Sequence, residues 1–196
     1  DVIADPAVAP KAIFVSAHAS GPLAADYDFT LKGKESFLQA AVTALSKLTE
    51  GKLHLAVGGE DVSPFSGLKD ISLYKVNGPH PAGNVGTQIA KLDPINKGET
   101  VWTVNAQDLV IIGELLVTGK YNADRIIALA GSSVKAPKYY RTTIGAEVST
   151  FVYDAGLVEE NVRVINGDVL TGKQTSPKGH LGAYNNMVTV IPEGDD

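Results

Sequence analysis

The chain of 196 residues is 44% hydrophobic and 20% charged, and its formal net charge is −5. This composition can supply a buried core and differs from that of a disordered chain. The sequence has no cluster of lysine and arginine, which argues against a nucleic-acid-binding protein. Because it has no cysteine, these residues cannot form disulfides, thiol nucleophiles, Cys-ligated zinc sites or Cys-ligated iron–sulfur clusters.

Neither a membrane span nor a signal peptide is indicated by the sequence. The best candidate for a span, residues 109–117, is too short and contains Glu114. Residues 1–6 lack the basic and apolar regions of a signal peptide. The chain does not start with methionine and ends just after a strand-like run, so we expect it to be part of a longer protein.

Strand and helix patterns alternate along the first half of the chain. The apolar run of residues 11–17 predicts a buried strand, and residues 53–57 and 71–76 predict two more. Between the first two, residues 34–48 carry apolar side chains at helical spacing, and Gly51 follows as a stop signal.

A second helix is predicted to begin after Asn105, a plausible N-cap with Asp108 at the third helical position. Residues 109–116 are apolar almost all round, so we expect this helix to be buried on most sides and to end at Gly119. Residues 125–130 then predict another buried strand. The alternation favours an α/β fold with a largely parallel sheet.

The pattern changes near Pro137, beyond which no long helical stripe follows. Asn166-Gly167 lies between the strand-like residues 162–165 and 168–170, which predicts a tight hairpin. Residues 187–191 predict a final strand. We therefore expect a small β-rich unit after an α/β domain, with the two covering residues 1–136 and 137–196.

Isolated polar residues give only weak signals for chemistry. None of the histidines has a neighbour at metal-ligand spacing, and His54 lies inside a predicted strand, which favours a structural role. Ser16 and His18 lack the strained turn of a hydrolase nucleophile. Asp26 and Asp28 would share one face of an extended segment, where two carboxylates could perform acid–base chemistry or bind a cation, although solvated loop carboxylates are more common. We therefore assign no catalytic or metal-binding residue.

The densest signal is the segment of residues 77–87, in which glycines and prolines specify an irregular backbone after a predicted strand. Its spacing matches neither the dinucleotide-binding nor the P-loop fingerprint. Two interpretations stay open: a rigid connector, which the residues alone favour, and a loop that contacts a ligand or partner. The candidate binding residues are Gly78, His80, Pro81, Gly83, Asn84 and Gly86.

Several segments together are similar to the A subunits of the sodium-translocating NADH:quinone reductases. The most specific is the string Gly-Pro-His-Pro-Ala-Gly at residues 78–83. The match runs through essentially the whole chain and includes residues 11–16, 22–29, 101–104, 127–131, 161–165 and 182–184.

The resemblance implies a Rossmann-like domain followed by a small β-grasp domain of the soluble-ligand-binding type. It also implies a peripheral position on the cytoplasmic side of a bacterial inner membrane, with the other subunits of the reductase, integral ones included, as partners. Relatives of this architecture carry glycine-rich flavin and NADH loops and cluster-binding cysteines, which this chain lacks. We therefore expect no cofactor in these residues, with quinone as a candidate ligand in the complex.

Three hypotheses about function follow. The first is a structural or assembly segment of the reductase, associated with quinone and not catalytic alone. The second is a free-standing Rossmann-type flavin or NAD oxidoreductase, against which the missing glycine fingerprint argues. The third is a soluble-ligand-binding module carried by residues 137–196. Nucleic acid is not expected as a partner in any of them.

Overall fold

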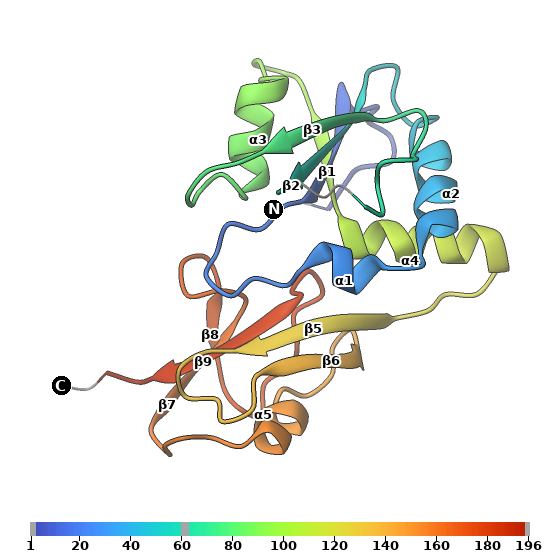
Figure 1. Cartoon of the computed structure of the whole chain (residues 1–196). Coiled ribbons are helices and arrows are strands. Elements are labelled where there is room, and N and C mark those ends of the chain that lie inside the picture. Colours follow the sequence, from blue (N-terminus) through green and yellow to red (C-terminus); the bar gives the residue numbers. More distant parts are fainter. Residues whose placement is uncertain (1–2, 60–62, 195–196) are drawn as a thin grey trace. The chain divides into compact units, whose positions relative to one another are not determined.

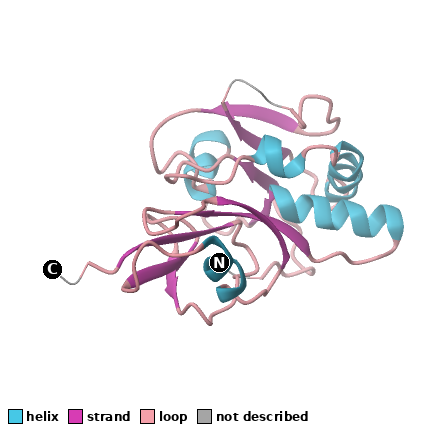
Figure 2. Cartoon of the chain, turned by 60° about the horizontal axis from the view of Figure 1, so that its bottom comes forward, coloured by secondary structure: helices cyan, strands magenta, loops and turns pink. Residues whose placement is uncertain are grey.

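The computed structural model describes residues 3–59 and 63–194 and divides the chain into two compact units (Figure 1). The first unit contains residues 1–20 and 26–122. The second contains residues 21–25 and 123–196. Most of the helices belong to the first unit, whereas the second consists mainly of strands and loops (Figure 2).

A four-stranded parallel sheet forms the centre of the first unit, in the order β3-β2-β1-β4. The predicted strands at 11–17, 53–57 and 71–76 are all present, and β1 lies in the middle because its apolar residues can be buried on both faces. The strands are β1 (Ala12–Ala17), β2 (Leu53–Gly58), β3 (Ser72–Val76) and β4 (Val101–Asn105).

Helices cover both faces of this sheet. Ile13 and Val15 of β1 point to one face, where they join the core formed with the second and fourth helices. Ala12 and Phe14 point to the other face and contact Ile89 of the third helix. The helices are α1 (Tyr27–Leu31), α2 (Glu35–Leu45), α3 (Val85–Leu92) and α4 (Ala106–Thr118).

The predicted start and end of α4 are confirmed, but the prediction that its second half is buried is wrong. Asn105 caps the helix by accepting a hydrogen bond from the Gln107 amide at 2.9 Å, and Gly119 ends it with a φ of 71°. Leu109 is fully buried, but residues 115–118 are exposed. α4 packs closely on α2 at Gly113, where a Cβ would lie 1.8 Å from the Phe37 carbonyl oxygen, whereas the last turn of α4 is not covered by the described residues of the first unit.

The second unit is a mixed five-stranded sheet in the order β6-β5-β9-β7-β8. Only β5 and β9 pair in parallel, and the other neighbours are antiparallel. Helix α5 (Ser149–Ala155) places Phe151 and Val152 in the core on one face. The strands are β5 (Asp124–Ala130), β6 (Lys138–Thr143), β7 (Val162–Asn166), β8 (Lys173–Thr175) and β9 (Met187–Pro192).

The units divide between Asn122 and Ala123, before the boundary expected near Pro137. The shift arises because the strand at Asp124–Ala130 pairs with β6 and β9 rather than with the parallel sheet of the first unit. The expected fold class, a parallel α/β domain followed by a β-rich domain, is confirmed.

The hairpin around Asn166-Gly167 is present, but its turn is longer than predicted. β7 ends at Asn166 and β8 begins only at Lys173, so residues 168–170 are not a strand. Asp168 explains the difference, because its carboxylate accepts hydrogen bonds from the Leu170 and Thr171 amides at 2.8 and 2.9 Å and closes a turn there.

Candidate functional site

The candidate loop lies at the carboxyl edge of the parallel sheet. It follows β3 and leads into α3, and it contacts the segment that follows β1. In open α/β sheets, ligands bind outside the carboxyl ends of the strands, where the strand order reverses. Here the order reverses at β1, which has β2 on one side and β4 on the other.

Gly83 fixes the loop against the segment after β1. Its amide donates a hydrogen bond to the Ser20 hydroxyl at 2.8 Å. A Cβ at position 83 would lie only 2.3 Å from the Ser20 backbone nitrogen, so glycine is required for this approach. The buried side chain of Gln88 in α3 adds two weaker hydrogen bonds, from its amide to the carbonyls of Ala82 and Gly83, both at 3.3 Å.

His80 is half-buried and also contacts Ser20. Its Nδ1 lies 3.3 Å from the Ser20 hydroxyl oxygen. The peptide bond between His80 and Pro81 is cis. Pro81 and Gly78 are exposed, and Gly78 has a φ of 137° that only glycine adopts readily.

Asn84 and Gly86 form the end of the loop and the first turn of α3. Asn84 is the exposed N-cap residue, although its side chain makes no capping hydrogen bond. Gly86 is exposed, and a Cβ there would meet no atom within 4 Å. The six candidate residues thus lie in one loop, and glycine has a structural requirement at positions 78 and 83 but not at 86.

Two neighbours of this edge, His18 and Gly58, were not assigned a site role from the sequence. A Cβ on Gly58, at the end of β2, would lie 2.0 Å from His18 Nδ1, so the imidazole sits directly on the β2 backbone. Burial lowers the pKa of His18, and its Nε2 has no hydrogen-bond partner among the described residues. No local motif marks this pair, because the two residues are 40 positions apart in sequence.

The other polar candidates have structural roles. The Ser16 hydroxyl is 3.4 Å from the backbone carbonyl of His18, not from the imidazole. Asp26 and Asp28 do not share a face of an extended segment, because Asp28 lies in α1 and Asp26 caps that helix by accepting from the Asp28 amide at 2.9 Å.

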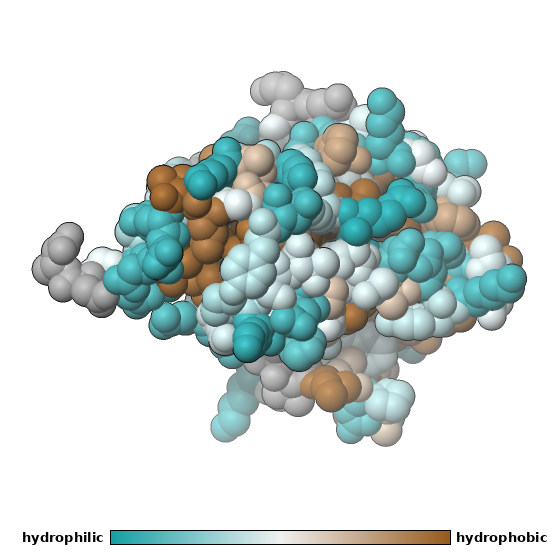
Figure 3. Space-filling model, turned by 90° about the horizontal axis from the view of Figure 1, so that it is seen from below, coloured by the Kyte–Doolittle hydropathy of each residue, from teal (hydrophilic) through white to brown (hydrophobic). Residues whose placement is uncertain are grey.

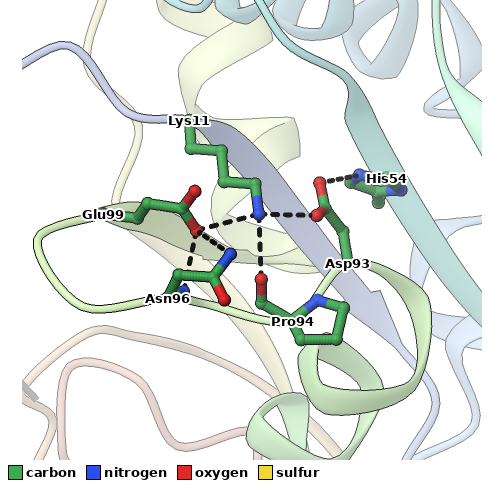
Figure 4. Close-up of polar contacts among 6 residues, drawn as sticks. All are labelled: Lys11, His54, Asp93, Pro94, Asn96 and Glu99. Carbon is green, nitrogen blue, oxygen red and sulfur yellow. Dashed lines mark hydrogen bonds and ion pairs between the residues drawn. The ribbon is translucent and has the colours of Figure 1, made fainter.

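A second polar cluster lies at the amino edge of the same sheet (Figure 4). Lys11 Nζ contacts carboxylate oxygens of Asp93 and Glu99 at 2.8 and 2.9 Å and the Pro94 carbonyl at 2.8 Å. These hydrogen bonds raise the pKa of Lys11 and lower that of Asp93. The cluster therefore ties the α3–β4 connection to the start of β1.

His54 borders this cluster and is structural, as its position in a strand suggested. It is 2% exposed and stacks on Phe14 with ring centroids 4.5 Å apart. Its Nε2 lies 3.6 Å from the Asp93 carboxylate. Burial lowers the pKa of His54 more than Asp93 raises it.

Within residues 3–59 and 63–194, no three His, Asp or Glu side chains are grouped so that they could hold a metal ion. Across the same residues, every helix is too short or too polar to cross a membrane. For recognition, the site at the carboxyl edge offers backbone amides, the Ser20 hydroxyl, the His80 imidazole and exposed loop backbone.

The fold defines a class of chain in which a parallel α/β domain precedes a mixed β-sheet domain. Two solved structures of an NAD⁺-reducing [NiFe]-hydrogenase share it. The H₂-reduced form aligns with a TM-score of 0.63 and 13% identity over 96% of this chain and 41% of that chain. The air-oxidised form aligns with a TM-score of 0.60 and 15% identity over 98% of this chain and 41% of that chain. At this identity the likeness concerns the fold alone.

The chain belongs to the NqrA family. Residues 1–121 match the family described as the NqrA second alpha/beta domain, and residues 126–176 match the NQRA C-terminal domain. The resemblance drawn from the sequence motifs is thereby confirmed.

Similar curated proteins are named as the A subunit of the Na(+)-translocating NADH-quinone reductase. The protein of Neisseria meningitidis serogroup B is 43% identical over 188 residues, which cover 94% of this chain and 41% of that protein. The protein of Vibrio campbellii is 39% identical over 189 residues, which cover 96% of this chain and 42% of that protein. The chain thus spans about two-fifths of the length of these relatives.

Proposed function

We propose that this chain is a segment of the NqrA subunit of a sodium-translocating NADH-quinone reductase and that it serves assembly rather than redox chemistry. Family membership and the shared name of the relatives support the first part. The lack of cysteine and of a glycine fingerprint supports the second. The partners are then the other subunits of the complex, and the position is peripheral, on the cytoplasmic side of a bacterial inner membrane.

Within this role, the loop of residues 78–86 contacts a partner subunit. The observation that carries this proposal is the anchoring of Gly83 on Ser20, with the amide and hydroxyl oxygen 2.8 Å apart. An anchored loop loses little conformational entropy on binding, which favours recognition. Exposed Pro81 and Asn84 and half-buried His80 are the side chains that such a loop offers.

A quinone head group is a second candidate for the same loop. The first turn of α3 follows Asn84, whose side chain does not cap it, so backbone N–H groups there could donate to a quinone carbonyl oxygen. The imidazole of His80 is a further donor when the appropriate nitrogen is protonated.

The test is the double variant His80→Ala and Asn84→Ala in the full-length subunit, within the complex. We expect it to reduce co-purification with the membrane subunits, or, if quinone is the ligand, to raise the KM for quinone while assembly stays intact. Lys47→Ala, an exposed change after α2, is the matched control. A double variant that assembles and reduces quinone like the parent would show that the loop is only a connector.

The absence of a redox centre is tested separately. We expect the purified full-length subunit to show no stoichiometric flavin spectrum and no bound zinc, haem or iron–sulfur cluster within these residues. A flavin bound at stoichiometric level and lost on substitution in this chain would favour the Rossmann-type oxidoreductase instead.

A further inference from the structure

The last turn of α4 exposes a run of large apolar side chains. Leu115, Leu116 and Val117 are 41%, 56% and 59% exposed, and Tyr121 just after the helix is 65% exposed. Successive helical residues point about 100° apart, so three consecutive apolar side chains span about 200° of the helix surface. A helix surface with such a wide apolar face is normally covered by protein.

Several polar groups at this tip are paired with one another. The Thr118 hydroxyl donates to the Glu114 carbonyl at 2.7 Å, and the Gly119 amide donates to the Leu115 carbonyl at 2.8 Å. The Glu114 carboxylate accepts from the Asn122 side-chain amide at 3.1 Å. Burying the tip would leave these particular groups partnered, which lowers the cost of burying a helix end.

We propose that this tip, residues 115–121, is an interface inside the full-length subunit, covered by the part of the subunit that precedes residue 1. The chain matches only 41% of the relative from Neisseria meningitidis, and its first 121 residues match a domain described as the second one. Most of such a subunit, including an earlier domain, is thus available to cover the tip.

The connectivity of the chain favours the part of the subunit before residue 1, rather than the part after residue 196, as the cover of the tip. Residues 3–20 and α4 belong to the first unit. The residues that lead to the other end of the chain, 123–194, belong to the second unit. A domain joined ahead of residue 1 is therefore tethered directly to the unit that carries the tip, which raises its effective concentration there.

The chemistry of the tip favours a permanent partner. The exposed side chains at 115–117 are all aliphatic, and Lys120 is the one charged residue of the tip. Permanent interfaces are more hydrophobic than transient ones and resemble a protein core. In the view from below, brown apolar side chains form a connected area at the left of the surface and smaller areas elsewhere among hydrophilic ones (Figure 3).

The first experiment measures cysteine labelling in the isolated full-length subunit, on a background from which any cysteine outside these residues has been removed. These 196 residues contain none. We expect Leu116→Cys to react with a maleimide about tenfold more slowly than Leu48→Cys, the matched control, whose native leucine is 49% exposed. Equal rates in the isolated subunit would overturn the proposal.

The second experiment identifies what covers the tip. A photo-crosslinking phenylalanine derivative is placed at position 116 of the full-length subunit, and crosslinked peptides are identified by mass spectrometry. Crosslinks to residues ahead of residue 1 support the proposal. Crosslinks mainly to residues after 196, to a second copy or to another subunit overturn it. If either variant fails to fold, amide hydrogen exchange of residues 114–121 in the parent subunit decides: rapid exchange refutes coverage.

Discussion

Gly83 and Gly86 lie three residues apart in the candidate loop, yet they are glycines for different reasons. Gly83 is held by a close approach to the Ser20 backbone, whereas Gly86 has open space around its Cα. We expect Gly83→Ala to lower the free energy of unfolding by about 1–3 kcal/mol, because backbone must move to admit the methyl group. Chemical denaturation of the full-length subunit measures this.

The matched control for that substitution is Gly86→Ala. It lies in the first turn of α3 at an ordinary φ, so we expect it to be neutral or to stabilise by up to about 1 kcal/mol. A Gly83→Ala variant as stable as Gly86→Ala would mean that the contact with Ser20 does not constrain the loop.

His54 makes stability depend on pH. Burial lowers its pKa in the folded state, so the folded protein binds fewer protons than the unfolded chain just below pH 6.5. The stabilisation from neutral His54 is complete above pH 6.5 and is lost as pH falls below it. We expect His54→Phe, which keeps a ring against Phe14, to reduce the fall in stability between pH 7 and pH 5.

The contributions of other titratable groups to this pH dependence can be distinguished from that of His54. His18 also has a pKa lowered by burial and contributes to the slope in the same direction. The lowered pKa values of Asp93 and Glu99 act only as pH falls below their ordinary values of 3.8 and 4.5. His180→Gln, an exposed change, is the control. An unchanged slope between pH 7 and pH 5 in His54→Phe would contradict the assignment.

At the scale of elements, α4 has two energetically different halves. Leu109 is fully buried in the core, so Leu109→Ala should cost about 2–5 kcal/mol in the 196-residue chain. Leu116→Ala should change stability by less than about 0.5 kcal/mol there, because that side chain is mostly exposed. Thermal unfolding of both variants measures the difference, and similar losses would place the tip in the core.

The β7–β8 hairpin depends on Gly167, whose φ is 103°. We expect Gly167→Val to destabilise the second unit by more than about 1 kcal/mol, because a β-branched residue resists this backbone angle. A Cβ at position 167 would also lie only 3.0 Å from the Gly172 Cα, which adds to the strain. Chemical denaturation followed in the second unit measures the loss. Val169→Thr in the same loop should be nearly neutral, and a tolerated Gly167→Val would show that the loop can rearrange.

Local patterns predicted the elements that bury a regular face, and failed where partners come from far along the chain. The strands β1 and β2 and the helix α2 follow directly from their apolar spacing. The strand β5 was recognised, but sequence could not indicate that it pairs with β6 and β9. The strand β6 was not predicted, because it is a polar edge strand without alternation of buried residues.

The candidate site shows the same limit. Its glycine and proline content located the loop of residues 78–86, because those residues act on their own backbone. The partner Ser20 lies 63 residues from Gly83, and no local rule connects them. The residues within the loop were therefore predictable, but its anchoring on the segment after β1 was not.

At the scale of the whole molecule, the division into two units predicts where a protease cuts first. All three lysines are exposed, but Lys120 lies at the end of the first unit, whereas Lys135 lies in the connection between the paired strands β5 and β6 and Lys138 begins β6. We expect trypsin to cleave the 196-residue chain, which lacks the part of the subunit proposed to cover residues 115–121, first after Lys120 and to leave two resistant pieces. Lys120→Gln should delay this cleavage, and a first cut after Lys135 or Lys138 would instead favour the boundary near Pro137.

The place of β1 in its sheet also determines when the first unit can be completed during synthesis. β1 is made first, but one of its edges pairs with β4, which ends at Asn105. Until the ribosome has made that residue, a nascent chain carries an apolar strand with an open edge, a surface prone to aggregation. Lys11, which bonds to Asp93 and Glu99, joins the start of β1 to the α3–β4 connection, so this tie also forms late in the synthesis of the first unit.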